Sequence, residues 1–375
     1  MRELYFDHHA STPLDARVAD VMREVQRVPL GNPASPHAAG RRARAILEDA
    51  RAKVAAAVGA KPTEVIFTSG GTEACNLGVL GLVGAEGAIV TTEIEHPAVA
   101  EPIVSLRDRT IRRLGFQGGV APAEHEVRSA LAEPCALLAV QSVNHETGTI
   151  VPAERWCEMA TDRGAPSFVD ATQALGKLRI DFETSAASAL ALASHKIGGP
   201  AGAGALIVRR GVAIDPRMLG GSQERGLRAG TPDVIAMAGF GAACALVEER
   251  LRDQSRIGSM RDRIEQTLVA RGGIVNGTAA NGAAPRVATV VDASFLGWRS
   301  TTLVAALDLE GLEVASGAAC SSGVDRPSPV VLAMTQGDSS RASSAIRISL
   351  GVETTDDDVA RAIAILDRVL ARTPA

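Results

Sequence analysis

The chain has 375 residues, enough to bury a large core and to divide into two domains. Its 46% hydrophobic and 22% charged residues are typical of a soluble globular protein, and no apolar run approaches the roughly 18 to 20 residues of a bilayer-spanning helix. A net charge of −4 and an aromatic content of 3% argue against a nucleic-acid partner, because such partners need a basic field and stacking rings.

The amino terminus and the cysteines indicate the compartment. Residues 1–15 are charged throughout and lack the apolar core of a signal peptide, which favours the cytoplasm. The cysteines are odd in number and include no CxxC pair, so neither a disulfide framework nor a zinc site is indicated. A functional cysteine would therefore act as a thiol. The five are Cys75, Cys135, Cys157, Cys244 and Cys320.

Short apolar runs alternate with helical patterns along most of the chain. Apolar residues at helical spacing predict helices over 38–58 and 154–163, and continuous apolar runs predict buried strands. Strands that alternate with helices are typical of an α/β fold with a mostly parallel sheet covered on both faces. The predicted strands are 64–70, 87–93, 136–144, 166–173, 189–196 and 203–210.

The pattern changes near residue 248, where one long Arg-rich helix is predicted over 248–268. A final helix is predicted from Thr355 to about Arg372. Together with strand-like runs between them, these elements predict a smaller α+β domain. We expect a large domain over 15–252 and a small domain made of 1–14 and 253–375. The strand-like runs are 286–294, 312–323 and 344–351.

Polar residues follow the predicted strands, where open α/β sheets bind their ligands. In "TSGGTEACN", Gly71 and Thr72 open a helix that can hold a phosphate on backbone N–H groups. Each feature alone has an ordinary explanation, such as a helix cap or a structural histidine. Together they place several kinds of polar group at one edge of the sheet. The other residues are His96, Asn144, Asp170, Gln173, Ser194, His195 and Lys196.

A phosphate site, a carboxylate and a lysine indicate pyridoxal 5′-phosphate. A lysine bonds to the aldehyde of this cofactor, and a carboxylate keeps the ring nitrogen protonated. We predict that Lys196 is this lysine, and that the small residues of "IGGPAGAG" beside it leave room for a flat cofactor. A dinucleotide is not indicated, because GxGxxG is absent.

Motifs along nearly the whole chain resemble the cysteine desulfurases of the class V aminotransferase group, closest to the branch serving iron–sulfur cluster assembly and tRNA thiolation. The resemblance implies PLP-dependent transferase fold type I with a seven-stranded, mostly parallel sheet. It also implies a homodimer that converts L-cysteine to L-alanine and a persulfide for an acceptor protein. The motifs are "YFDHHASTPLD", "GNPASPH", "FTSGGTEACN", "EHPAV", "VNHETG", "VDATQALGKLRID", "SHKIGGPAGAGAL", "QERGLRAGTPD", "SGAACSSG" and "AIRISLG".

The resemblance implies roles residue by residue. Lys196 would bind the cofactor and move the Cα proton, His96 would stack on the ring and handle protons at the substrate thiol, and Cys320 would become the persulfide. Arg347 would grip the substrate carboxylate, because a guanidinium matches a carboxylate bidentately. Asp170 would contact the pyridine nitrogen, and Gln173 and Asn144 would lie on the ring oxygen side, with Asn144 also near the substrate. The residues implied at the phosphate are Gly71, Thr72, Ser194, His195 and the partner subunit's Thr231.

Some positions depart from the family pattern. Ala193 stands where a serine is usual, with Ser194 shifted by one; His145 stands in the usual Asn-Asn-Glu run, and Gln223 replaces a histidine. Residues 199–202 read Gly-Pro-Ala-Gly instead of GPKG. With the short tail after "RISLG", these changes favour an acceptor other than a standard iron–sulfur scaffold.

Two alternatives stand beside the desulfurase. A selenocysteine lyase, another C–S lyase or an aminotransferase of the same family would not need Cys320. A catalytically silent homologue or sulfur carrier would not need the catalytic set at all. The presence of the catalytic set argues against a silent homologue or carrier. This set consists of Lys196, Asp170, His96, Cys320 and Arg347.

Overall fold

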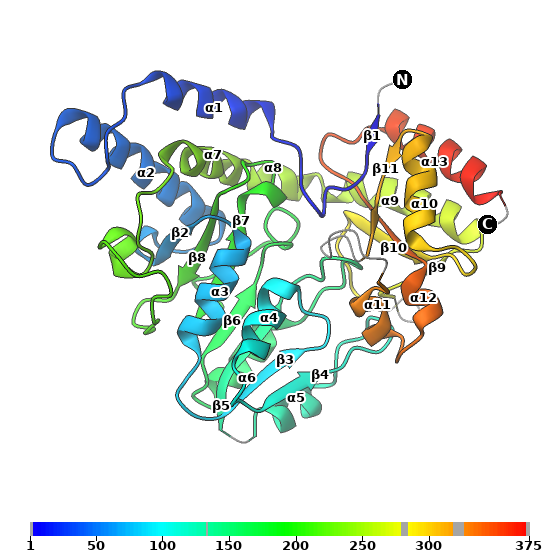
Figure 1. Cartoon of the computed structure of the whole chain (residues 1–375), viewed down its shortest axis with the longest axis horizontal. Coiled ribbons are helices and arrows are strands. Elements are labelled where there is room, and N and C mark those ends of the chain that lie inside the picture. The colour runs from blue at the N-terminus through cyan, green and yellow to red at the C-terminus, as the bar shows by residue number, and fades with distance from the viewer. Residues whose placement is uncertain (1–2, 133, 279–283, 318–325, 373–375) are drawn as a thin grey trace.

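A computed structural model describes residues 3–132, 134–278, 284–317 and 326–372 of the chain. Its main sheet consists of β2 (Val65–Thr68), β3 (Ala88–Thr92), β4 (Ile111–Leu114), β5 (Cys135–Gln141), β6 (Ser167–Asp170), β7 (Ala189–Ala193) and β8 (Gly204–Val208). The strand order is β2-β8-β7-β6-β5-β3-β4 (Figure 1). Only β8 runs against the other strands of this sheet, so the predicted α/β fold with a mostly parallel seven-stranded sheet is confirmed.

One strand of this sheet, β4, escaped the sequence prediction. Its four residues include Arg112 and Arg113 between two apolar residues, so no continuous apolar run marks it. It lies at the sheet edge beside β3. An edge strand tolerates charged side chains because one side of it remains open to solvent.

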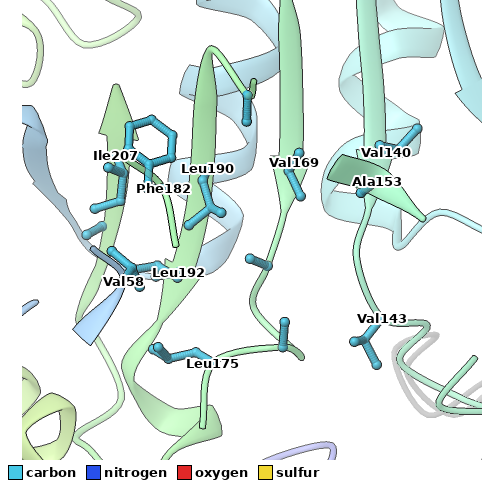
Figure 2. Close-up of a cluster of buried hydrophobic side chains, with 14 of the residues drawn as sticks. Val58, Val140, Val143, Ala153, Val169, Leu175, Phe182, Leu190, Leu192 and Ile207 are labelled. Atoms are coloured by element: carbon cyan, nitrogen blue, oxygen red, sulfur yellow. The ribbon is translucent and has the colours of Figure 1, made fainter. Parts of the chain in front are cut away.

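Helices cover both faces of the sheet. They are α1 (Ala16–Arg27), α2 (Ala38–Ala57), α3 (Gly71–Leu82), α4 (Pro97–Ser105), α5 (Glu124–Ala130), α6 (Ala153–Thr161), α7 (Val234–Ala245) and α8 (Val247–Arg252). Side chains alternate between the faces along each strand. Leu137 belongs to the core beneath α3 and α4, whereas its neighbour Leu138 belongs to the larger core shared with α2, α6 and α7. Figure 2 shows that larger core, with Val169, Leu190 and Ile207 projecting from neighbouring strands.

A second, smaller core lies beside the large sheet (Figure 1). It combines Leu4 and Phe6 from the amino terminus with apolar residues of the last third of the chain. The division into a large domain over 15–252 and a small domain of 1–14 and 253–375 stays a prediction. The helices and strands within residues 1–14 and 253–375 are β1 (Leu4–Tyr5), α9 (Gln254–Ala270), β9 (Ile274–Val275), β10 (Val290–Ser294), α10 (Ser300–Leu309), β11 (Leu312–Glu313), β12 (Ala315–Ser316), α11 (Pro329–Met334), α12 (Ser339–Ser343), β13 (Ala345–Ser349) and α13 (Asp356–Leu370).

The long helix predicted over 248–268 is divided into α8 and α9 at Asp253. The backbone of Asp253 stays right-handed helical, with φ −82° and ψ −10°, and Ile257 N–H still donates to its carbonyl oxygen. The interruption is therefore a single residue in a nearly continuous helical path. Across the described ranges, none of the helices combines the length and hydropathy needed to cross a bilayer.

Candidate functional site

A cavity of about 260 Å³ lies where β2, β3, β5, β6 and β7 end. These strands share one direction, so the residues that follow them meet at the same sheet edge. Most of the side chains predicted to hold a cofactor line this cavity, as the strand ends suggested. They are Gly71, Thr72, His96, Asp170, Gln173, His195 and Lys196.

Lys196 is placed by β7 and by the amino-terminal segment. A single 3-10 turn, Ser194–Lys196, follows β7 and directs the lysine into the cavity. Its Nζ donates to the carbonyl oxygens of His9 at 2.6 Å and Ala10 at 3.0 Å. Thr12 Oγ1 in turn donates to the Lys196 carbonyl at 3.2 Å. The segment "HHAST" therefore forms one wall of the site, a role that the sequence analysis did not identify.

Asp170 supplies the buried carboxylate of the cavity. It ends β6 with 5% of its surface exposed, and its Oδ1 accepts a hydrogen bond from Thr172 N–H at 2.9 Å. Beside it lies Cys75 of α3, which also lines the cavity. Burial raises the pKa of the Cys75 thiol well above its usual value, and the charges of Asp170 and Glu95 add to the effect. Cys75 is thus a neutral site residue that sequence reasoning missed; its helical spacing from Thr72 was the available signal.

His96 caps α4 and lines the cavity as a neutral imidazole. Ala98 N–H donates to its Nδ1 at 3.0 Å, so the neutral ring carries its hydrogen on Nε2. Burial lowers the pKa of His96, and it lowers that of His145 further. The two rings meet edge to face with centroids 4.9 Å apart. Burial also lowers the pKa of His195 to about 4, so all three rings are uncharged at neutral pH.

The turn that opens α3 depends on glycines. Gly70 has φ +151°, a conformation that side chains disfavour, and Gly71 and Thr72 follow it at the helix amino terminus. A Cβ on Gly204 of β8 would lie 2.6 Å from the Gly70 carbonyl carbon. The small residues after Lys196 were expected to leave room for the cofactor. Instead, Gly204 makes room for the Gly70 turn, and none of residues 198–204 lines the cavity.

Two residues expected at the cofactor do not line the cavity. Ala193 and His195 line it, whereas the Oγ of Ser194 between them is buried against Gly199 and has no hydrogen-bond partner among the described residues. Asn144 is used within its own turn: its Oδ1 accepts from the backbone of Glu146 at 3.0 Å, and its Nδ2 donates to the Ile94 carbonyl at 3.0 Å.

The remaining predicted residues differ in their placement. Arg347 is 4% exposed and donates to Asp7 Oδ1 at 2.7 Å and to the His145 carbonyl at 3.0 Å. Its Nε is buried and finds no acceptor within the described part of the chain. Thr231 is exposed and lies outside this cavity. Cys320 lies outside the described residues.

The side chains present fit pyridoxal 5′-phosphate. The α3 amino terminus offers backbone N–H groups to a phosphate, Asp170 offers a carboxylate to a protonated ring nitrogen, and Lys196 offers an amine to an aldehyde. His96 adds an uncharged aromatic ring. The cavity volume of about 260 Å³ lies just below the range of about 300 to 1,000 Å³ usual for small-molecule sites.

The chain is similar to known proteins along nearly its whole length. The family profile described as aminotransferase class-V matches residues 4–362. An IscS-like cysteine desulfurase of Mycobacterium tuberculosis is 38% identical over 98% of this chain and 96% of its own length. Cysteine desulfurase IscS of Dictyoglomus turgidum is 34% identical over 99% of this chain and 95% of its own length. A solved NifS-like protein superposes with a TM-score of 0.89 at 30% identity, covering 98% of this chain and 99% of its own. The solved structure of SspA in complex with cysteine superposes with a TM-score of 0.81 at 28% identity, covering 94% of this chain and 99% of its own.

The lysine assignment can be tested by spectroscopy. Protein loaded with pyridoxal 5′-phosphate is expected to be yellow, and Lys196→Ala is expected to lose the visible band of the covalently held cofactor. Lys177→Gln is the matched control, because Lys177 Nζ bonds to Gln173 Oε1 at 2.7 Å without lining the cavity. An unchanged visible spectrum in Lys196→Ala, or loss of the band in Lys177→Gln alone, would contradict the assignment.

Proposed function

Since the chain belongs to the aminotransferase class-V family and is a cysteine desulfurase, we propose that Lys196, His96 and Cys320 carry out its reaction on L-cysteine. The observation that carries the proposal is the convergence of Lys196, Asp170 and His96 on one cavity at the carboxyl edge of the sheet. The products are L-alanine and a persulfide on Cys320.

The enzyme depends on pyridoxal 5′-phosphate, which supplies an aldehyde for amines and a ring that withdraws electrons from the substrate carbons. We assign its phosphate to the backbone N–H groups of Gly71 and Thr72, with His195 nearby. Asp170 would hold a proton on the ring nitrogen, since its carboxylate is buried and oriented by Thr172 N–H. The nonpolar wall of Ala98 and Val143 would exclude water from the ring.

Two side chains handle protons in this proposal. Lys196 Nζ takes the proton from the substrate Cα and returns a proton to the carbon skeleton, because a lysine amine inside the cavity is the base within reach. His96 is uncharged and carries its hydrogen on Nε2. Its Nε2–H therefore donates a hydrogen bond to the substrate thiol and orients it. Arg347 binds the substrate carboxylate in this proposal. It is not among the residues that line the cavity: its guanidinium donates to Asp7 and to the His145 carbonyl, and its Nε–H is buried with no acceptor among the described residues.

The sulfur step conserves atoms and electrons. The thiolate of Cys320 attacks the substrate sulfur, an S–S bond forms, and the Cβ–S bond breaks. The electron pair of the broken bond stays with the carbon, which takes up a proton and becomes the methyl group of alanine. The sulfur is oxidised to the persulfide level as the carbon is reduced, so no external oxidant enters.

We also propose a homodimer that works in the cytoplasm and passes its sulfur to an acceptor protein. Thr231 is exposed and outside its own chain's cavity, as expected for a residue that completes the partner's site. The segment before it exposes Met218 at 45% and Leu219 at 82%, apolar surface that a second subunit would cover. Arg228 in the same segment pairs with Glu73 at 2.8 Å, which ties it to the first turn of α3.

The carboxylate role of Arg347 predicts a binding defect. Arg347→Lys keeps the charge but removes Nε–H and the planar donor geometry, so the KM for L-cysteine should rise about tenfold, with a smaller change in kcat. Steady-state kinetics on cofactor-saturated enzyme measure this. Arg341→Lys is the control, since Arg341 bonds to Asn276 in the small domain. Equal KM values for the two variants would refute the role.

The role of Cys320 separates the desulfurase chemistry from that of other C–S lyases. Cys320→Ser should bind the cofactor and L-cysteine normally, while alanine formation falls at least about a hundredfold because the attacking thiolate is gone. Mass spectrometry of wild-type enzyme after brief exposure to L-cysteine should find one added sulfur on the peptide that holds Cys320. Cys244→Ser is the buried-thiol control. Alanine formation at the wild-type rate in Cys320→Ser would transfer the assignment to a lyase without a nucleophilic cysteine.

The shared site can be tested by subunit mixing. Thr231→Ala alone should weaken cofactor binding about tenfold, the effect of one lost hydrogen bond to a charged group. A dimer of one Lys196→Ala subunit and one Thr231→Ala subunit has one site with both residues intact. A randomly mixed equimolar sample should therefore regain tight cofactor binding at about one quarter of its sites. If mixing restores no site, Thr231 does not serve the partner.

A further inference from the structure

Glu146 is a buried carboxyl group for which the proposed reaction has no role. It lies in the turn after β5, in the motif "NHETG", with 1% of its surface exposed. Burying a carboxyl group is costly unless specific partners satisfy it. Its partners therefore indicate why the chain keeps an acid at this position rather than an apolar residue.

The carboxyl of Glu146 contacts the chain on both sides of the interval that carries Cys320. On the carboxyl-terminal side, Ser328 Oγ donates to Glu146 Oε2 at 2.5 Å. On the amino-terminal side, Glu146 packs directly on Gly317, since a Cβ placed there would overlap Oε2. One carboxyl group thus joins two positions that are eleven residues apart in the sequence.

Both contact positions belong to ordered structure. Ser328 is 1% exposed and caps α11, because its Oγ also accepts a hydrogen bond from Val331 N–H at 3.0 Å. Gly317 directly follows β12, in which Ala315 pairs with Arg347 of β13. The strand and the helix on either side of the Cys320 interval are therefore both fixed relative to the carboxyl group.

On its other side, Glu146 contacts residues of its own turn, one of which lines the cofactor cavity. Its N–H donates to Asn144 Oδ1 at 3.0 Å, and its Oε1 lies 3.6 Å from His145 Nε2. His145 lines the cavity and packs edge to face on His96. A path of direct contacts thus joins the cavity wall to both ends of the Cys320 interval.

The charge state of Glu146 suits this position. Burial raises the pKa of its carboxyl group to about 8, with a contribution from nearby Asp292 that Arg347 opposes. The group therefore keeps its proton at neutral pH and accepts from Ser328 as an uncharged acid. Glutamine has nearly the same shape and the same accepting oxygen, so it is the conservative replacement.

We propose that Glu146 is a positioning residue that holds the two ends of the Cys320 interval against the cofactor cavity and so sets the rate of sulfur transfer to Cys320. The inference rests on the proposed function in one respect, that Cys320 receives the sulfur. Glu146 itself need not touch the substrate.

The test compares Glu146→Ala, Glu146→Gln and Ser328→Ala in the full-length, cofactor-loaded enzyme. Glu146→Ala and Ser328→Ala should each slow the single-turnover appearance of persulfide on Cys320 by about tenfold, the effect of one buried hydrogen bond. The cofactor spectrum and the L-cysteine concentration that half-saturates its change should stay within about twofold. Glu146→Gln should restore most of the rate, and the Glu146→Ala/Ser328→Ala double variant should be no slower than either single variant.

A hydroxyl elsewhere on the same helix provides the matched control. Thr335 Oγ1 donates to the Val331 carbonyl at 2.7 Å, and Thr335→Val should leave the persulfide rate unchanged. Wild-type persulfide rates in both Glu146→Ala and Ser328→Ala would overturn the proposal. So would equal slowing in Thr335→Val, or additive losses in the double variant.

Failure of the proposed function would look different. In that case wild-type enzyme would form alanine without adding sulfur to Cys320. If Glu146→Ala does not fold, Ser328→Ala and Glu146→Gln still decide the matter: the proposal requires the first to be slow and the second to be close to wild type.

Discussion

The cavity exists because the strands that surround it run in the same direction, so the loops after β2, β3, β5, β6 and β7 leave the sheet at one edge. Lys196, Asp170 and His96 are far apart in the sequence. Asp170 is the last residue of β6, Lys196 follows the end of β7 by three residues, and His96 follows the end of β3 by four. The one reversed strand, β8, contributes differently. Its Gly204 has no side chain, which allows the Gly70 turn to approach and open α3 beside the cavity.

Burial then decides which groups near the cavity hold charge. His96, His145 and His195 are neutral at neutral pH because desolvation disfavours the imidazolium. Burial likewise raises the pKa of Glu95 and Glu146 to about 8, so both carboxyls keep their protons. The polar wall is thus mostly uncharged, and any charge that remains acts in a medium where water screens it little.

The amino-terminal segment ties the two cores together. Asp7 pairs with Arg347 of the smaller core, and the His9 ring bonds to Thr289 Oγ1 at 2.9 Å. Two and three residues after Asp7, the carbonyl oxygens of His9 and Ala10 accept hydrogen bonds from Lys196. A change at this segment would therefore reach Lys196 and Arg347 at once, which makes it as much a part of the site as the strand ends are.

The sequence by itself determined the fold class and most of the cavity. Apolar runs mark strands and parallel strands share an edge, so His96, Asp170 and Lys196 could be brought together without coordinates. Local pattern could not locate β4, because Arg112 and Arg113 interrupt its apolar residues, which its place at the sheet edge allows. Nor could it decide where Ser194 points, since this residue lies in the 3-10 turn after β7, where strand alternation no longer holds. It also could not show that Cys75 lies beside Asp170, that Asp7 pairs with Arg347, or that Glu146 accepts a hydrogen bond from Ser328. Those contacts join residues distant in sequence, and only tertiary packing brings such residues within bonding distance.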